Sequence, residues 1–214
     1  ELEPVVGRTR RVDRNGAGQL ETRNWDGAFG VDLQNSDQIA IGYSTSYEYL
    51  PRPSNIGGVI LPIGDYDFAS LRMGYNFGRQ RRLAGNVAVE QGTFYDGHKT
   101  AVSLSGSRVN ISPRFSAEPS YSVNQVEVST GSFTTHLVGS RVTFTMTPLM
   151  FTSALLQYNS STRSVSTNVR LRWEYQPGSE LFVVYNEQRD AAASGFPDLA
   201  NRALIVKVNR LFRF

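Results

Sequence analysis

The amino-acid sequence predicts an all-β fold: a transmembrane antiparallel up-and-down β-barrel of about 11–12 strands, in a single domain over residues 1–214. Two observations carry this prediction. Apolar and polar residues alternate along many segments, as they do in strands whose two faces meet different surroundings. These segments are also about ten residues long, which is the length that a tilted strand needs to cross a bilayer; soluble strands average about five to six residues.

Composition agrees with this class and excludes several others. Hydrophobic residues make up 40% of the chain, the mean hydropathy is -0.31, and no run of 18 apolar residues predicts a transmembrane helix. A barrel hides its apolar residues in alternation, so a low average does not contradict it. There is no cysteine, and the net charge of +3 comes from scattered Lys and Arg. We therefore expect no thiolate metal site, no cofactor and no nucleic-acid partner.

The strands follow one another with the same pattern. Residues 4–12 are a candidate first strand, and the segment 24–33 is the first with clear alternation, with Trp25, Phe29 and Val31 on one face. A helix would mix Asp into that apolar stripe, so the segment is predicted to be a strand. The same test predicts the others at 38–49, 66–77, 83–93, 99–111, 115–128, 133–146, 150–159, 165–175, 180–189 and 201–214.

The connections between these strands alternate in length. Short turns with turn-forming residues are predicted at 34–37, 112–114, 147–150 and 176–179. Longer links are predicted at 50–64, 93–99, 159–164 and 190–200, while 129–132 is brief although it falls on the same side. Barrels of the outer membrane have tight periplasmic turns and longer extracellular loops, so the alternation favours that class.

The longest link, 50–64, is unusual because residues 59–63 are apolar. Three glycines and three prolines across it predict a loop without regular structure. An apolar loop of this length either folds back over the barrel mouth or binds something hydrophobic. We favour the first alternative.

Aromatic residues gather near the ends of the predicted strands. One group is Phe77, Trp173, Tyr175, Phe212 and Phe214, beside short turns; the other is Tyr47, Tyr49, Tyr66 and Tyr95, at the opposite ends. Two belts of aromatic side chains are what two bilayer interfaces select.

Charged residues occupy the polar rows and are predicted to face the barrel lumen. They are Asp26, Asp32, Glu48, Arg72, Glu90, Glu118, Arg141, Arg170, Arg172, Glu174 and Lys207. Acidic and basic groups are roughly balanced. They either pair with one another and fill the interior, which we favour, or they line a solute pathway of weak ion selectivity.

Catalytic and metal-binding alternatives rest on few residues. Asp96 and His98 could form a base at the barrel rim, but no nucleophile accompanies them at a defined spacing. His136 is too distant in sequence to define a metal site with His98, and Asp65 and Asp67 are a weak candidate for Ca²⁺. No catalytic residue and no metal site is therefore predicted.

The end of the chain carries the most specific pattern. Leu204, Val206, Val208, Phe212 and Phe214 alternate with a polar row of Lys207, Asn209 and Arg213, whereas Arg210 puts a charge on the apolar row. This strand resembles the closing strand of bacterial outer-membrane barrels, which the barrel-assembly machinery reads through its terminal aromatic residue. The resemblance implies an outer-membrane location, a lipid bilayer partner, and Phe212 and Phe214 as an assembly signal.

A second resemblance covers residues 157–214. The phrases at 157–161, 168–186, 201–203 and 210–214, with Lys207, resemble the C-terminal signature of an uncharacterised outer-membrane barrel domain. That domain usually follows a family-nine-type carbohydrate-binding module in Gram-negative bacteria. Members are several times longer than this chain, which implies that residues 1–214 are the C-terminal part of a larger barrel. Some members carry a hydrolase label, but no G-x-S-x-G turn is present here, so no functional residue is carried over.

Together these patterns predict either a passive pore or a membrane-docking barrel for a carbohydrate-recognition module. An outer-membrane hydrolase with a rim site and a structural barrel that anchors partner proteins are the alternatives. Carbohydrate and other outer-membrane proteins are the candidate partners. The barrel is expected to close either between residues 4–12 and the last strand or, as we favour, with other polypeptide at both edges.

Overall fold

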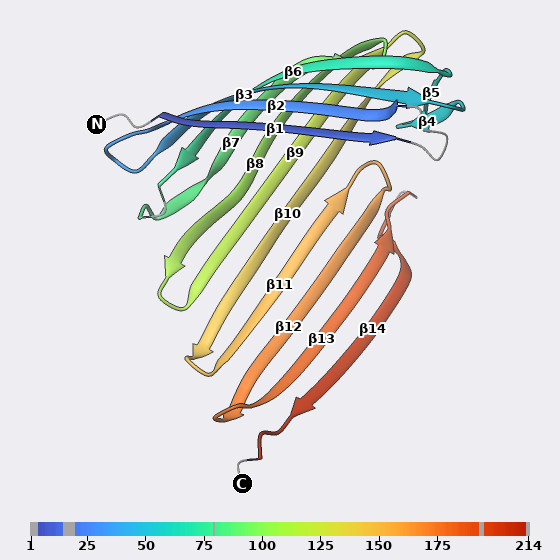
Figure 1. Cartoon of the computed structure of the whole chain (residues 1–214). Helices are drawn as coiled ribbons and strands as arrows, with labels where there is room; N and C mark the ends of the chain where they lie inside the picture. The colour runs from blue at the N-terminus through green and yellow to red at the C-terminus, as the bar shows by residue number, and fades with distance from the viewer. Residues whose placement is uncertain (1–3, 15–19, 79, 193–194, 213–214) are drawn as a thin grey trace. The chain divides into compact units, whose positions relative to one another are not determined.

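The computed structural model (Figure 1) describes residues 4–14, 20–78, 80–192 and 195–212. Within these ranges the chain forms β-strands, turns and loops, and it contains no helix long and apolar enough to cross a membrane. The strands are β1 (Pro4–Arg14), β2 (Leu20–Asp32), β3 (Gln38–Leu50), β4 (Ser54–Ile56), β5 (Val59–Leu61), β6 (Gly64–Phe77), β7 (Leu83–Phe94), β8 (Gly97–Ser112), β9 (Phe115–Val128), β10 (Gly131–Thr147), β11 (Met150–Asn159), β12 (Ser164–Gln176), β13 (Ser179–Asp190) and β14 (Asp198–Asn209).

Twelve of these strands form one sheet in the order of the chain, with β4 and β5 paired separately. Neighbouring strands such as β1 and β2, β3 and β6, and β12 and β13 pair antiparallel. This confirms the all-β antiparallel fold. The sheet is not closed into a barrel: among the described residues β1 pairs only with β2, and β14 only with β13. Of the two closures considered, the one between residues 4–12 and the last strand is therefore not formed among the described residues, and the favoured one, with other polypeptide at both edges, stays a prediction.

Two compact units make up the chain and are described separately. The N-terminal unit contains residues 1–105 and 122–135, and the C-terminal unit contains residues 106–121 and 136–214.

In the N-terminal unit the register aligns apolar side chains across four strands. Phe29 lies opposite Ile41, Ile41 opposite Met73, and Met73 opposite Val89. These four side chains are 41% to 54% exposed. Since side chains alternate between faces, the even-numbered positions of β2, β3, β6 and β7 form the opposite surface, which we call the N-terminal polar face.

The C-terminal unit repeats this division. Leu171 lies opposite Val183, and Val183 opposite Val206, so the apolar rows of β12, β13 and β14 coincide as expected. Leu204, Val206 and Val208 are 59% to 67% exposed. The other surface, which we call the C-terminal polar face, consists of the even-numbered positions of β12 and β13 and the odd-numbered positions of β14. Arg170 lies on it.

Little of the chain is buried. The buried apolar side chains of the described residues are Leu50, Val59, Leu61, Ala84, Ala88 and Val126. A soluble antiparallel sheet covers its apolar face with a second layer of protein. Here the long apolar rows of both units are exposed instead.

The link 50–64 is more regular than the sequence indicated. The prediction that its glycines and prolines exclude regular structure was wrong, because β4 and β5 form a hairpin within it. Gly57 and Gly58 have φ of 63° and 89°, which is the left-handed backbone that a tight two-residue hairpin turn requires. Asn55 accepts a hydrogen bond from the amide of Gly58 at 3.1 Å.

This hairpin packs against the rest of the N-terminal unit, as in the favoured alternative, but the sheet of the described residues forms no closed barrel whose mouth it could cover. Leu61 is 1% exposed, and the hydroxyl of Thr130 donates to the carbonyl of Ile60 at 3.1 Å. The hydroxyl of Tyr66 donates to the carbonyl of Pro62 at 2.9 Å. Ile60 and Ile63 remain exposed.

Most predicted strand bounds shift by a few residues in the structure, and two of these differences matter most. The link 93–99 is in fact a turn of two residues, Tyr95 and Asp96, between β7 and β8. The closing strand ends at Asn209 and not at residue 214, and beyond it the amide of Leu211 donates to the hydroxyl of Ser179 at 3.0 Å. Phe212 is exposed with Arg210 over its ring, and Phe214 lies outside the described residues.

Candidate functional site

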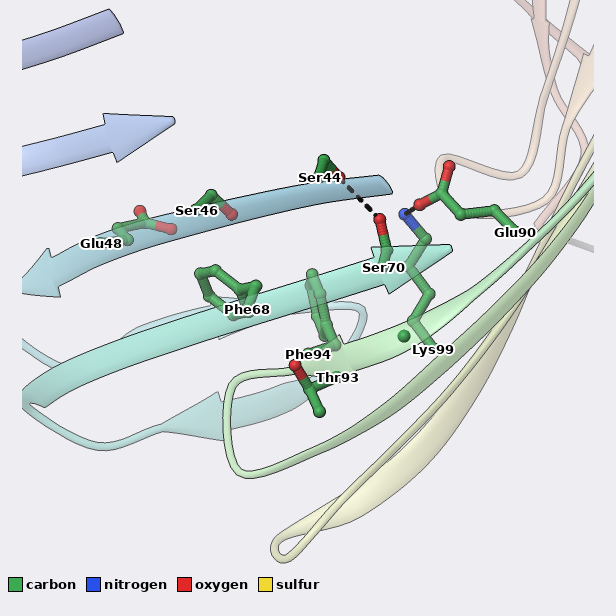
Figure 2. A pocket seen from close by; sticks show the side chains of 10 residues that line it. Ser44, Ser46, Glu48, Phe68, Ser70, Glu90, Thr93, Phe94 and Lys99 are labelled. Carbon is green, nitrogen blue, oxygen red and sulfur yellow. Dashed lines mark hydrogen bonds and ion pairs between the residues drawn. The ribbon is translucent and has the colours of Figure 1, made fainter. Parts of the chain in front are cut away.

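A cavity of about 290 Å³ opens on the N-terminal polar face (Figure 2). Strands β3, β6, β7 and β8 supply its walls. The lining residues are Ser44, Ser46, Glu48, Phe68, Ser70, Glu90, Gly92, Thr93, Phe94 and Lys99. Hydroxyl and carboxylate oxygens therefore lie beside two aromatic rings.

The strand register explains why hydroxyl groups meet here. Ser44 lies opposite Ser70, and their hydroxyl oxygens are 2.8 Å apart. Ser70 in turn lies opposite Gly92. A Cβ atom at Gly92 would lie 2.3 Å from the carbonyl oxygen of Ala69 and 2.6 Å from the Cα of Ser70, so only glycine fits this close approach of the two strands.

The charges in the cavity are largely paired. Glu90 accepts a hydrogen bond from Lys99 at 2.9 Å and lies 3.5 Å from the guanidinium of Arg72 (Figure 2 draws Glu90 and Lys99). Glu48 accepts a hydrogen bond from the hydroxyl of Tyr95 at 3.1 Å. The wall is thus polar but nearly neutral, which suits an uncharged polar solute better than a free ion.

An aromatic cluster adjoins the cavity. The ring centroid of Tyr95 lies 4.8 Å from that of Tyr66, 5.0 Å from that of Phe68 and 4.7 Å from that of Phe94. The placement of Tyr66 corrects the sequence analysis: it occupies the even-numbered row of β6, so it belongs to the N-terminal polar face and not to an outward aromatic belt. Burial, with the nearby carboxylate of Glu48, raises the pKa of Tyr95 to about 12.

The charged residues that the sequence predicted to face the lumen lie on the polar face of their unit. Those of the N-terminal unit are Asp26, Asp32, Glu48, Arg72 and Glu90; those of the C-terminal unit are Arg141, Arg170, Arg172, Glu174 and Lys207. Glu118 lies 3.9 Å from Arg141, and Glu180 forms an ion pair with Arg172. Ion pairing is therefore incomplete. The predicted lumenal charges without an ion-pair partner among the described residues are Asp26, Asp32, Glu48, Arg170, Glu174 and Lys207.

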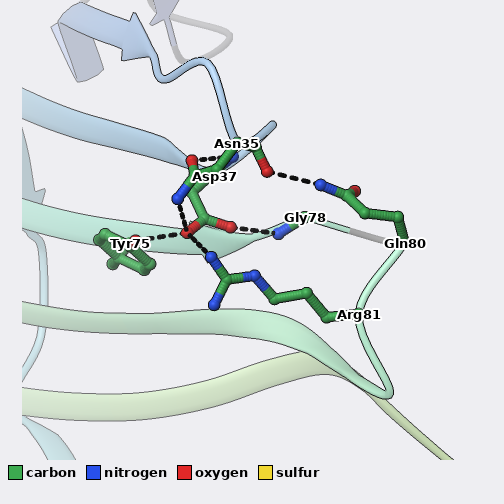
Figure 3. Close-up of polar contacts among 6 residues, drawn as sticks. All are labelled: Asn35, Asp37, Tyr75, Gly78, Gln80 and Arg81. Carbon is green, nitrogen blue, oxygen red and sulfur yellow. Dashed lines mark hydrogen bonds and ion pairs between the residues drawn. The ribbon is translucent and has the colours of Figure 1, made fainter.

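A buried carboxylate in the turn after β2 was not singled out by the sequence (Figure 3). Asp37 is fully buried, and it accepts hydrogen bonds from the hydroxyl of Tyr75 at 2.6 Å, the amide of Gly78 at 2.7 Å and the guanidinium of Arg81 at 2.6 Å. The side chain of Asn35 donates a further bond at 3.0 Å. The bond from Tyr75 and those from Gly78 and Arg81 hold the pKa of Asp37 below its ordinary value of 3.8. This group locks two neighbouring turns together and leaves no room for a substrate.

The residues of the catalytic and metal-binding alternatives are not arranged as a catalytic or metal site. Asp96 accepts a hydrogen bond from Ser129, while His98 forms none with it. His136 stacks on the ring of Tyr121 and lies 3.0 Å from its hydroxyl.

The candidate Ca²⁺ ligands are also engaged elsewhere. Asp65 accepts a hydrogen bond from Tyr47, and Asp67 lies 3.8 Å from Arg23. The described part of the chain contains no group of three or more acidic or histidine side chains that could hold a metal ion.

Comparison with known proteins adds no identity. No family model matches the chain, and no match is found among curated proteins or solved structures. The class is therefore defined by the fold alone: an antiparallel β-meander in which each unit has one exposed apolar face and one polar face.

Proposed function

We propose that this chain is part of a bacterial outer-membrane β-barrel that acts as a passive pore for small polar solutes. One observation carries the proposal: apolar side chains are exposed in register on one face of each unit, while charges and hydroxyl groups occupy the other. Lipid would cover the apolar rows, and water would fill the space beside the polar ones.

The exposed rows support lipid contact more than contact with a second soluble layer. In the N-terminal unit the row crosses β2, β3, β6 and β7, and it consists of aliphatic and aromatic side chains with no charge at its centre. Soluble monomers rarely expose a continuous apolar patch of this kind. The C-terminal unit shows the same feature independently on β12, β13 and β14.

The proposal requires both outer strands of the sheet to be paired in the membrane. An open edge within lipid would leave amide and carbonyl groups without partners, at several kcal/mol each. Strands β1 and β14 would therefore pair with further β-strands, as in the larger barrel that the sequence resembles.

The cavity of the N-terminal polar face suggests what could pass. Its serine and threonine hydroxyls offer both donors and acceptors, and Phe68 and Phe94 offer apolar ring surfaces. A small polyhydroxylated solute such as a sugar matches this mixture, whereas the paired charges predict weak ion selectivity.

Conductance tests the proposal directly. The purified protein, reconstituted in planar bilayers, should give stepwise currents with weak ion preference. Arg170→Glu should shift selectivity toward cations, because Arg170 has no partner among the described residues and lumenal charge concentrates counter-ions. Arg52→Glu, in the exposed loop after β3, is the control and should change selectivity little.

An inserted protein without conductance at any voltage would overturn the pore and favour the anchoring alternative. Insertion is checked separately with spin labels at positions 171 and 170. The label at position 171 should be accessible to lipid, and the label at position 170 should be accessible to water. The reverse result would show that the assignment of the two faces of β12 is wrong.

A further inference from the structure

The C-terminal polar face contains a patch that is not polar. Phe182, Val184 and Ile205 line a depression of about 280 Å³ together with Arg170 and Lys207. Ile205 is 53% exposed although it lies on the face that carries the charges. The proposed lipid contact accounts for the apolar rows on the other side of these strands. It does not account for an apolar floor beside two cations on the polar face.

The register brings these five residues together from three strands. Arg170 on β12 lies opposite Val184 on β13, which lies opposite Ile205 on β14. One step along the same face, Phe182 lies opposite Lys207. With strands about 4.8 Å apart and a rise of about 3.3 Å per residue, the Cα atoms of Arg170 and Lys207 are roughly 12 Å apart across the apolar floor.

Both cations lack the partners that their neighbours have. Arg172, two residues along β12, forms an ion pair with Glu180, and Arg141 lies 3.9 Å from Glu118. The side chains of Arg170 and Lys207 have no hydrogen bond or ion pair among the described residues. Their positive charge is therefore available at the depression.

We propose that this depression binds a small organic anion, a carboxylate attached to a compact apolar body. The guanidinium of Arg170 and the ammonium of Lys207 receive the carboxylate, because both are charged donors and guanidinium offers a planar pair of N–H groups. The apolar body lies on Phe182, Val184 and Ile205. A hydrated inorganic anion leaves that floor unused, and a neutral apolar molecule leaves the cations unused.

The volume limits the size of this ligand. Small-molecule sites usually span about 300–1,000 Å³, so a depression of about 280 Å³ suits a single ring or a short branched chain. Phenylacetate has both features and serves as the probe. The inference concerns binding only and holds whether or not the protein conducts.

Equilibrium dialysis of radiolabelled phenylacetate against the protein in lipid nanodiscs, with empty nanodiscs as the blank, tests the site. We expect saturable binding that weakens about tenfold in Arg170→Gln and in Lys207→Gln, as for loss of a charge-assisted hydrogen bond. Phenylacetamide, which keeps the ring and loses the charge, and acetate, which keeps the charge and loses the ring, should both bind at least about tenfold more weakly.

Arg141→Gln is the matched control, since it removes a cation from the same polar face at a paired position outside the depression. It should leave phenylacetate binding unchanged. Absence of saturable binding, equal binding of phenylacetamide, or an equal loss in Arg141→Gln would each overturn the site. A protein that conducts without binding refutes this inference alone, and one that binds without conducting refutes the pore alone.

Discussion

The hydroxyl of Tyr95 donates a hydrogen bond of 3.1 Å to the carboxylate of Glu48, and so ties the turn between β7 and β8 to strand β3. Tyr95 has a φ of 51°, which is uncommon for a residue with a large side chain. Its ring contacts three aromatic neighbours, as described above. The bond and these contacts hold a strained turn in place beside the cavity.

Tyr95→Phe should lower the free energy of unfolding by about 1 kcal/mol, since it removes one hydrogen bond and keeps the ring. The effect should depend on pH in a defined direction. The hydroxyl of Tyr95 has a pKa of about 12 in the folded protein, against an ordinary value of 10.0. Its contribution to the free energy of unfolding is therefore complete below pH 10 and is lost as the pH rises toward 12. Urea unfolding followed by tryptophan fluorescence measures the difference between wild type and variant.

The control for this change is Tyr49→Phe, because Tyr49 forms no hydrogen bond through its side chain among the described residues. At pH 8 it should unfold like the wild type. A difference between wild type and Tyr95→Phe that stays constant from pH 8 to pH 12 would contradict the raised pKa.

Gly92→Ala should destabilise the protein by roughly 1–3 kcal/mol, because the new Cβ overlaps the backbone of β6 and the strands must separate. Gly42→Ala is a matched change on the same polar face, where the nearest atom to the new Cβ, the carbonyl oxygen of Gly27, lies at 3.8 Å. That variant should retain wild-type stability. The measurement is the urea midpoint of each variant. Equal midpoints would argue against the close approach of β7 to β6 at Gly92.

Asp37→Asn should destabilise the protein more than Asp26→Asn, since Asp37 is buried among four donors whereas Asp26 is exposed without a partner among the described residues. The lowered pKa of Asp37 fixes the pH dependence. Its carboxylate stabilises the folded state above pH 3.8, and this contribution is lost as the pH falls below that value.

Unfolding midpoints at pH 7 and at pH 3 measure this loss. The difference between wild type and Asp37→Asn should shrink on acidification. A difference of the same size at both values would show that Asp37 acts through shape and not through charge.

Leu171→Arg should cost about 2–4 kcal/mol if this side chain meets lipid near the middle of the membrane. The same residue type introduced on the opposite face, by Ser166→Arg, should be mild, because Ser166 shares the polar row with Arg170. The measurement is the midpoint of reversible unfolding from lipid vesicles. Equal costs for both variants would count against a membrane location of this sheet.

The sequence predicted which residues share a face, because that assignment depends only on the two-residue period of a strand. Phe29 and Ile41, or Leu171 and Val206, therefore fall on common rows in the structure as expected. The lengths of connections were less predictable. The left-handed backbone of Gly57 and Gly58 turns an apparent loop into a hairpin, and Tyr95 closes a turn in two residues through contacts with distant side chains.

Sites built across strands were not predictable from sequence alone. Asp37 becomes a buried anchor only because Tyr75, Gly78 and Arg81 reach it from the next hairpin. Likewise, Val184 and Ile205 interrupt the polar row of two strands, but only the register between β12, β13 and β14 places them under Arg170 and Lys207.

The small number of buried apolar side chains also has a calorimetric consequence. Unfolding of an ordinary globular protein raises the heat capacity by roughly 12–15 cal/mol/K per residue, because buried apolar surface becomes hydrated. Among the described residues only six apolar side chains are buried, so unfolding in a detergent that stays on the exposed ones should give a markedly smaller increase in heat capacity. The stability curve should then be flat with temperature, and cold denaturation should be absent from the accessible range.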